Sequence, residues 1–77
     1  MQPQTIGMAI IGAGRWGNHL VRNFSQHPNA RLVALVDLQG ERLQHLANKY
    51  GLETDGVVVT DDWRAVMQRP DVDGIAI

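Results

Sequence analysis

Short apolar runs alternate with amphipathic stretches along the chain, and this alternation restricts the fold more than any other feature. Runs rich in valine, isoleucine, leucine and alanine predict strands at residues 6–11, 31–37, 56–59 and 74–77. Such mostly apolar runs favour strands buried on both faces of a sheet. Single helices between them imply parallel pairing through right-handed crossovers. The sequence therefore predicts an α/β fold with a doubly wound parallel sheet of strand order 3-2-1-4.

Between these strands, apolar residues recur with the spacing of one helix face. The first helix is predicted from Arg15 until the sequence His27-Pro28-Asn29 ends it. Its apolar face consists of Trp16, Leu20, Val21 and Phe24. The second helix has an apolar face at the i, i+3, i+4, i+7 spacing, with Gly51 as its C-terminal cap. That face consists of Leu43, Leu46, Ala47 and Tyr50.

A third, short helix is predicted after Thr60, whose hydroxyl would cap the first turn, and Pro70 ends this segment. Its apolar side is predicted to consist of Trp63, Val66 and Met67. Asp61 and Asp62 at its start would complement the positive end of the helix dipole. A pair of metal ligands is the alternative role for these two carboxylates.

The sequence GAGRWG follows the first predicted strand and opens the first helix. It matches the pattern GxGxxG at Gly12, Gly14 and Gly17, and Asp37 ends the second strand twenty residues later. Strand, glycine motif, helix and acid in this order are typical of a dinucleotide-binding βαβ unit. Gly12 would permit the tight turn, and Gly14 would let the backbone reach a pyrophosphate. Gly17 would let the helix lie close to the strand.

The first turn of that helix, around Arg15 and Trp16, would hold the phosphate charge with its backbone N–H groups. The Asp37 carboxylate would accept hydrogen bonds from ribose hydroxyls and repel a 2′-phosphate, which favours NAD over NADP. Arg42 leaves that choice open, because it could reach a phosphate or lie solvated on its helix. The glycines could also form only a turn beside a solvated Asp37, and Trp16 could either stack on a ligand or pack on its helix face.

The remaining polar residues suggest no catalytic or metal site. His19, His27 and His45 are scattered, without partners at metal-binding spacing, so structural or solvated roles are predicted for them. Asp71 and Asp73 precede the last strand and are predicted to be turn residues. The chain has no cysteine, which excludes disulfides and thiolate ligands.

Composition narrows the class of protein further. The formal net charge of -1 over 77 residues argues against a dedicated nucleic-acid surface. A hydrophobic content of 44% with 19% charged residues is typical of a globular chain. No apolar run approaches the ~20 residues of a membrane span, and the first residues lack the features of a signal peptide. We expect a cytoplasmic protein whose partners include neither nucleic acid nor membrane.

The segments IIGAGRWG, RLVALVD, ERLQHLANKYG and DVDGIAI, taken together, are recognisable. Residues 6–77 resemble the N-terminal half of the nucleotide-binding domain of the Gfo/Idh/MocA oxidoreductases, the family of glucose-fructose oxidoreductase and inositol dehydrogenase. The resemblance implies hydride transfer between a nicotinamide cofactor and a hydroxyl or carbonyl carbon, commonly of a sugar, cyclitol or sugar nucleotide. The positions that it assigns to cofactor binding are Gly12, Gly14, Arg15, Trp16, Gly17 and Asp37.

The catalytic residues of that family have no counterpart in this sequence. The resemblance places a catalytic lysine, in a Glu-Lys-Pro motif, beyond Ile77, together with an aspartate and a histidine of a second α/β domain. Residues 1–77 are thus expected to form part of a dinucleotide-binding Rossmann domain whose catalytic second domain is absent from this chain. The alternative is a non-catalytic fragment that binds nucleotide or self-associates.

The last strand gives the prediction of self-association. From Gly74 to Ile77 it is apolar and carries no lysine or proline, so an unpaired edge there would be a template for another strand. Homo-oligomers through this edge, or domain swapping of the C-terminal segment, are therefore expected. A lysine in place of Ala76 is expected to lie on the exposed edge and to block such pairing.

Overall fold

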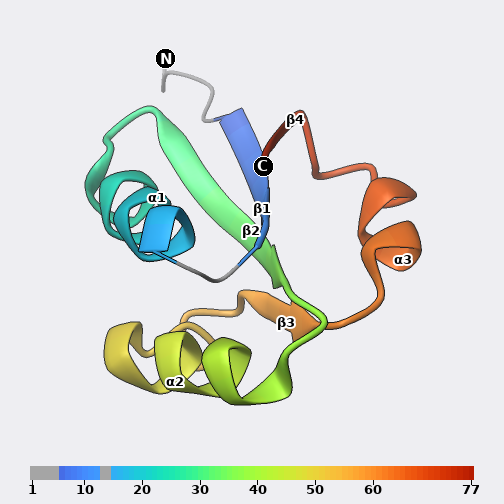
Figure 1. Ribbon diagram of the computed structural model, residues 1–77. Coiled ribbons are helices and arrows are strands. Elements are labelled where there is room, and N and C mark those ends of the chain that lie inside the picture. The colour runs from blue at the N-terminus through green and yellow to red at the C-terminus, as the bar shows by residue number, and fades with distance from the viewer. Residues whose placement is uncertain (1–5, 13–14) are drawn as a thin grey trace.

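The computed structural model describes residues 6–12 and 15–77, which form a central sheet flanked by helices (Figure 1). The strands are β1 (Ile6–Ile11), β2 (Ala30–Val36), β3 (Val58–Thr60) and β4 (Gly74–Ala76). The helices are α1 (Arg15–Gln26), α2 (Gly40–Tyr50) and α3 (Trp63–Met67). The predicted alternation of strands and helices is confirmed. Within the described ranges, no helix has the length and apolar character needed to cross a membrane. A location in the cytoplasm stays a prediction.

The sheet has the strand order β3-β2-β1-β4, and each neighbouring pair is parallel. This confirms the predicted doubly wound arrangement, in which the chain first winds outward through β2 and β3 and then returns to the other side of β1. The ligand site of such sheets lies outside the carboxyl ends of the strands, where the winding direction reverses. In this chain that point lies between β1 and β4.

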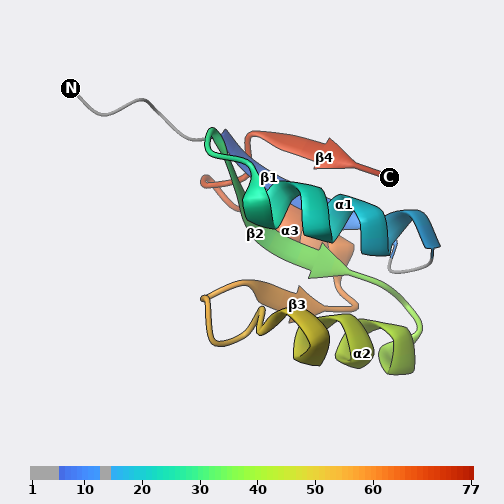
Figure 2. The same cartoon turned by 90° about the vertical axis from the view of Figure 1, so that its left-hand side faces the viewer.

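Helices cover both faces of the sheet, as predicted: α1 and α3 lie on opposite sides of β1 and β2 (Figures 1 and 2). The face that packs against α1 and α2 contains the larger hydrophobic cluster. Its buried members are Ile10, Val21, Leu32, Leu35, Leu43, Leu46, Ala47, Leu52 and Val57. The cluster on the α3 face is smaller and consists of Ala9, Ala34, Val36 and Val66. Because Ala9 and Ile10 are both fully buried on opposite faces, β1 is covered on both sides.

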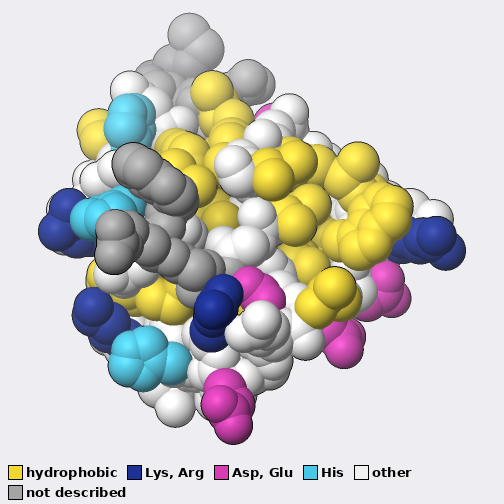
Figure 3. Space-filling view, in the orientation of Figure 1, with side chains coloured by type: hydrophobic (Ala, Val, Ile, Leu, Met, Phe, Trp, Pro, Cys, Tyr) yellow, Lys and Arg dark blue, Asp and Glu magenta, His cyan; other side chains and the backbone are white. Residues whose placement is uncertain are grey.

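The α3 face is only thinly covered, which corrects one expectation. Val66 is the one buried side chain of α3, whereas Trp63 is 45% exposed and Met67 is 52% exposed. Trp63, Val66 and Met67 have the i, i+3, i+4 spacing of one helix face, but in this five-residue helix only Val66 is buried. In Figure 3, apolar side chains gather on the side of the molecule formed by α3 and β4.

The capping residue of α3 is Asp62, and the expectation of a Thr60 cap was wrong. The Asp62 carboxylate accepts a hydrogen bond from the Ala65 N–H at 3.2 Å. Thr60 instead ends β3, and its hydroxyl oxygen accepts a hydrogen bond from the Asp62 N–H at 3.1 Å. Both residue types are good N-caps, and the position of the strand end decides between them.

The predicted third strand at residues 56–59 is shifted in the structure to Val58–Thr60. Gly56 has a positive φ of 84° and belongs to the turn that precedes the strand. Gly51 adopts the left-handed conformation, with φ 61°, and its N–H donates to the Ala47 carbonyl. This confirms Gly51 as the C-terminal cap of α2.

At the amino ends of the strands, Asp73 ties the last strand to the first. Its carboxylate accepts a hydrogen bond from the Gly7 N–H at 2.8 Å, and its own N–H donates to the Gly7 carbonyl at 2.7 Å. Nearby, the Arg69 guanidinium donates to the Asp71 carboxylate at 3.0 and 2.9 Å. These hydrogen bonds hold the pKa of Asp71 below its usual value. Asp73 therefore does more than the predicted turn residue, because it fixes where β4 meets β1.

Candidate functional site

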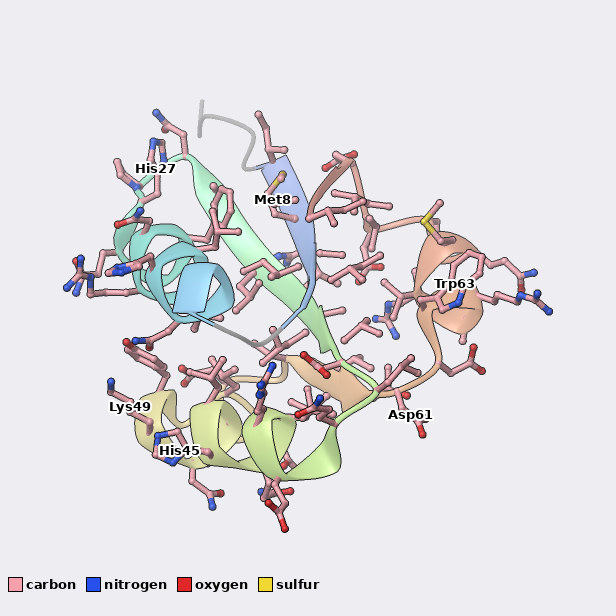
Figure 4. The ribbon with its side chains drawn as sticks, viewed as in Figure 1. Met8, His27, His45, Lys49, Asp61 and Trp63 are labelled. Atoms are coloured by element: carbon pink, nitrogen blue, oxygen red, sulfur yellow. The ribbon has the colours of Figure 1, made fainter. Side chains whose placement is uncertain are left out.

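The carboxyl ends of the three strands β1, β2 and β3 are level with one another. In the strand register Ile11 pairs with Val36, and Val36 pairs with Thr60. The residues that follow each strand therefore emerge side by side along one edge of the sheet. These residues are Gly12 and Asp37, together with Asp61, which Figure 4 shows beyond the end of β3.

Gly12 makes the first turn away from this edge. Its φ of 111° lies in a region that L-residues with side chains rarely adopt. Its N–H donates to the Val36 carbonyl at 2.7 Å, which continues the β1–β2 pairing by one residue. A Cβ added at Gly12 would meet no heavy atom within 4 Å, so the space beside this turn is open. The predicted tight turn at Gly12 is confirmed.

Gly17 lies in the first turns of α1, where the helix touches the turn after β1. It is buried, and a Cβ built on it would overlap the carbonyl oxygen of Gly12 and lie 3.0 Å from the Gly12 carbonyl carbon. A backbone carbonyl cannot move aside as a flexible side chain can. The absence of a side chain thus lets α1 lie directly against the end of β1, as the motif predicts.

The amino end of α1 is suited to hold an anion. The helix begins at Arg15, has 12 residues and has no acidic residue in its first turn. The first N–H groups of a helix have no partner within the helix and carry partial positive charge, so they attract phosphate. Gly14 lies outside the described residues, and so do the side chains of Arg15 and Trp16.

Asp37 stands at the same edge, directly after β2, and is half-buried. Its N–H donates to the Thr60 carbonyl at 3.3 Å, which extends the β2–β3 pairing. One carboxylate oxygen accepts a hydrogen bond from the Gln39 N–H at 2.7 Å, so the side chain is oriented by the backbone that leads into α2. Arg42 follows in the first turn of α2 and is exposed.

The other polar candidates have local roles or none that the structure reveals. The imidazole of His27 accepts a hydrogen bond from the Asn29 N–H at 3.0 Å, within the turn after α1. His45 is exposed on α2 (Figure 4). Asp62 caps α3, as described above. No group of three or more metal-ligating side chains occurs within residues 6–12 and 15–77.

Sequence reasoning missed one contact close to this edge. The Tyr50 hydroxyl donates a hydrogen bond to the side-chain carbonyl oxygen of Asn18 at 2.9 Å and thereby links α2 to α1. The helical spacing placed Tyr50 on the apolar face of α2, and it does pack against the core there. A buried tyrosine usually finds a partner for its hydroxyl, and that rule was the available signal.

With this geometry in place, the comparisons with known proteins fix the family. Residues 6–77 match the family model described as the Gfo/Idh/MocA oxidoreductase family, NAD-binding Rossmann fold. The chain belongs to this family. The glycine turn, the helix that follows it and the acid at the end of β2 are therefore parts of a nicotinamide-dinucleotide-binding fold.

Two curated relatives are similar in sequence. The oxidoreductase YrbE of Bacillus subtilis is 37% identical over 68 residues, which are 88% of this chain and 19% of that protein. A glycosyl hydrolase family 109 protein of Porphyromonas gingivalis is 33% identical over an alignment of 79 positions that covers 96% of this chain and 17% of that protein. The chain thus spans less than a fifth of the length of these relatives.

Two solved structures share the fold with a TM-score of 0.74. A scyllo-inositol dehydrogenase from Lactobacillus casei, with bound NAD(H) and scyllo-inositol, is 26% identical; the match covers 94% of this chain and 20% of that chain. A 3-ketoreductase from Actinomadura kijaniata, in complex with TDP-benzene and NADP, is 16% identical; the match covers 94% of this chain and 22% of that chain. Structural neighbours of this fold therefore bind either dinucleotide.

Proposed function

We propose that this chain binds the adenosine and pyrophosphate part of NAD within an oxidoreductase. The observation that carries the proposal is the level edge of β1, β2 and β3, which brings Gly12, the amino end of α1 and Asp37 together. Bound there, the dinucleotide supplies a nicotinamide ring that gives or takes hydride. The residues of this chain bind and orient the other half of the molecule.

The roles of the individual residues follow from their chemistry. The N–H groups of the first α1 turn, with Gly12, Gly14, Arg15, Trp16 and Gly17, form the pyrophosphate site. The open space beside Gly12 leaves room for the phosphates. The Asp37 carboxylate accepts hydrogen bonds from the adenosine ribose hydroxyls. Its charge would repel a 2′-phosphate, so we propose NAD as the cofactor and NADP as the weaker ligand.

The proposed substrate is a sugar, a cyclitol or a sugar nucleotide, with hydride moving to or from a hydroxyl or carbonyl carbon. The inositol dehydrogenase, which holds a cyclitol beside NAD(H), supports this class. Because the chain spans about a fifth of its relatives, we propose that residues outside 1–77 supply the catalytic groups and the substrate pocket. The isolated chain is then expected to catalyse no hydride transfer.

Calorimetric titration of NAD and NADP into the full-length protein tests the cofactor assignment. We expect NAD to bind and NADP to bind more weakly, because only NADP places a second negative charge beside Asp37. Replacing Asp37 with asparagine keeps the shape of the side chain and removes its charge, so it should narrow the difference between the two affinities. Tighter binding of NADP, or binding of neither dinucleotide, would contradict the proposal.

The edge of β4 supports a further part of the proposal, which is self-association. Within the described residues β4 pairs only with β1, and Ile77 beyond it is 93% exposed. An apolar strand with one unpaired edge is a template for a second strand. We expect two copies of this chain to associate through this edge, or to exchange the C-terminal segment.

The association is tested by a substitution at Ile77 and not at Ala76. Ala76 packs against the hydrophobic cluster under α1 and α2, so the expectation that a lysine there would lie on an exposed edge was wrong. Ile77→Lys changes the edge without entering the core. Light scattering across a dilution series should show oligomers for the isolated chain and fewer for Ile77→Lys. Ile6→Lys, the same substitution at the other end of the strands, should leave the size unchanged. A monomer at every concentration would contradict the association.

A further inference from the structure

The hydrogen bond between Tyr50 and Asn18 lies on the face of the sheet that α1 and α2 cover, and the proposed function assigns it no role. It joins residues 32 positions apart and links two different helices. Each of the two residues is half-buried. The hydrogen bond between Gln44 and Asn48, by contrast, stays within α2. The loss of the Tyr50 hydroxyl would therefore remove a polar link between α1 and α2 and leave their apolar packing in place.

Asn18 occupies a position that matters for the pyrophosphate site. It directly follows Gly17, whose backbone rests on the Gly12 carbonyl. Successive helical residues point about 100° apart around the axis. Gly17 therefore faces the end of β1 while Asn18 faces α2. Two contacts from adjacent residues, in different directions, fix both the distance of α1 from the sheet and its rotation about its own axis.

The rotation of α1 about its axis decides in which direction the N–H groups of its first turn point. These groups are directional donors, and hydrogen bonds weaken steeply when they are misaligned. A phosphate bound at a helix amino end therefore depends on how the first turn is held. Tyr50 touches this turn from outside, through Asn18, and does not itself lie among the residues proposed to contact the cofactor.

We propose that Tyr50 is a positioning residue for the cofactor: through Asn18 its hydroxyl holds the first turn of α1 in line with the pyrophosphate. The inference rests on the proposed function, because it concerns the same dinucleotide. This positioning role belongs to the Tyr50 hydroxyl and not to its ring. The ring packs against the core and lies 5.4 Å from the ammonium group of Lys49, and both contacts would survive without the hydroxyl.

Tyr50→Phe removes the hydroxyl alone and is the variant that tests this role. Binding of adenosine, ADP and NAD to the full-length protein is measured by calorimetry, with unfolding followed in parallel. We expect ADP and NAD to bind about two- to tenfold more weakly to Tyr50→Phe, the equivalent of one hydrogen bond. Adenosine, which has no phosphate, should bind as to the unaltered protein. Equal weakening of all three ligands would show a general structural effect and overturn the positioning role.

Two further variants sharpen the test. Asn48→Ala removes a hydrogen bond of the same 2.9 Å length, from Gln44, that stays within α2, so it should leave all three affinities unchanged. Asn18→Ala should weaken ADP binding as much as Tyr50→Phe, and the double variant no further, because both remove one interaction. Additive losses would overturn the inference.

The outcome for the unaltered protein separates this inference from the proposed function. If the unaltered protein binds none of the three ligands, the proposed function fails, and the positioning role fails with it. If it binds ADP and NAD, and Tyr50→Phe binds them equally well, only the positioning role is overturned.

Discussion

The two faces of the sheet are packed to different degrees. Toward α1 and α2, nine apolar residues form one buried cluster, and a glycine contact and a tyrosine hydrogen bond fix the helices in addition. Toward α3, the buried cluster has four members, and α3 leaves Trp63 and Met67 largely in solvent. Figure 4 shows Trp63 on α3, to one side of the sheet. The guanidinium of Arg64 lies 5.3 Å from its ring.

This difference indicates which side of the sheet must hold its residues in closely defined positions. The candidate cofactor site is built on the densely packed side, since a glycine turn and a helix end work only if their positions are held closely. The α3 side supports the sheet, but α3 itself contributes no residue to that site. Substitutions on the first side should therefore affect both stability and binding, and those on the second mainly stability.

The largest effect is expected from Gly17→Ala. The added methyl group would overlap the Gly12 carbonyl oxygen, so α1 must move away from β1. We expect a loss of about 3 kcal/mol in the free energy of unfolding. NAD affinity should fall more than about tenfold, as misplaced oxyanion or phosphate donors typically cost. Urea unfolding and calorimetry measure the two quantities.

Gly74→Ala is the matched control for this substitution. A Cβ at Gly74 would lie 2.9 Å from the sulfur of Met8 and 3.3 Å from its methyl carbon, and this flexible side chain can turn aside. The change should cost less than about 1 kcal/mol and leave NAD affinity unaltered. Equal losses for the two glycines would refute the contrast between the packed side and the open edge.

A smaller effect distinguishes the two hydrophobic clusters directly. Val21 on the α1 side and Val66 on the α3 side are 0% and 1% exposed, so replacing each with alanine removes the same buried group. We expect Val21→Ala to cost about 2–3 kcal/mol and Val66→Ala about 1–2 kcal/mol, because the thin α3 layer can settle into the space. Chemical denaturation measures both. If Val66→Ala costs more, the α3 side is the better packed.

The smallest expected effect is on the stability of the protein at acidic pH. The pKa of Asp71 is lowered, first by its hydrogen bonds to Arg69. The ionised pair therefore contributes stability above the unfolded aspartate pKa of about 3.9, and this contribution is lost as pH falls through the lower folded value. The Asp71 carboxylate is in contact with solvent, so the contribution is small. Asp71→Asn should flatten the acid limb of the stability profile slightly and leave stability at pH 7 almost unchanged. A large loss at pH 7 would contradict this.

Much of the fold and the site geometry could be predicted because both follow from local patterns. The apolar runs place each strand within two residues of its observed bounds, and parallel strands bring their carboxyl ends to one edge whatever the loops do. Gly12, Gly17 and Asp37 meet there for that reason. The roles of Gly12 and Gly17 in the turn and in helix contact are confirmed. Their binding of a cofactor stays a prediction.

The features that were predicted wrongly or not at all depend on contacts between residues that are far apart in the sequence or on the pairing of strands. Thr60 and Asp62 are both of residue types that cap helices well. Only the pairing of Thr60 with Val36 shows that Thr60 is the last residue of β3, so that the cap of α3 falls on Asp62. The Tyr50–Asn18 bond and the Gly7–Asp73 pair join positions 32 and 66 apart. Which face of β4 Ala76 occupies likewise depends on its pairing with Ile10. Each of these needs the assembled sheet.

The position of β1 in the sheet has a consequence for how the chain reaches this state. β1 precedes the other six described elements along the chain, yet its two neighbours in the sheet are β2 and β4, and the link at Gly7 must wait for Asp73. A nascent chain on the ribosome would therefore hold one side of its central strand without a partner until nearly all 77 residues had emerged. Contacts this distant in sequence slow folding. We expect β1 to be the segment most in need of protection during synthesis, although Ala9 and Ile10 at its centre are fully buried once folding is complete.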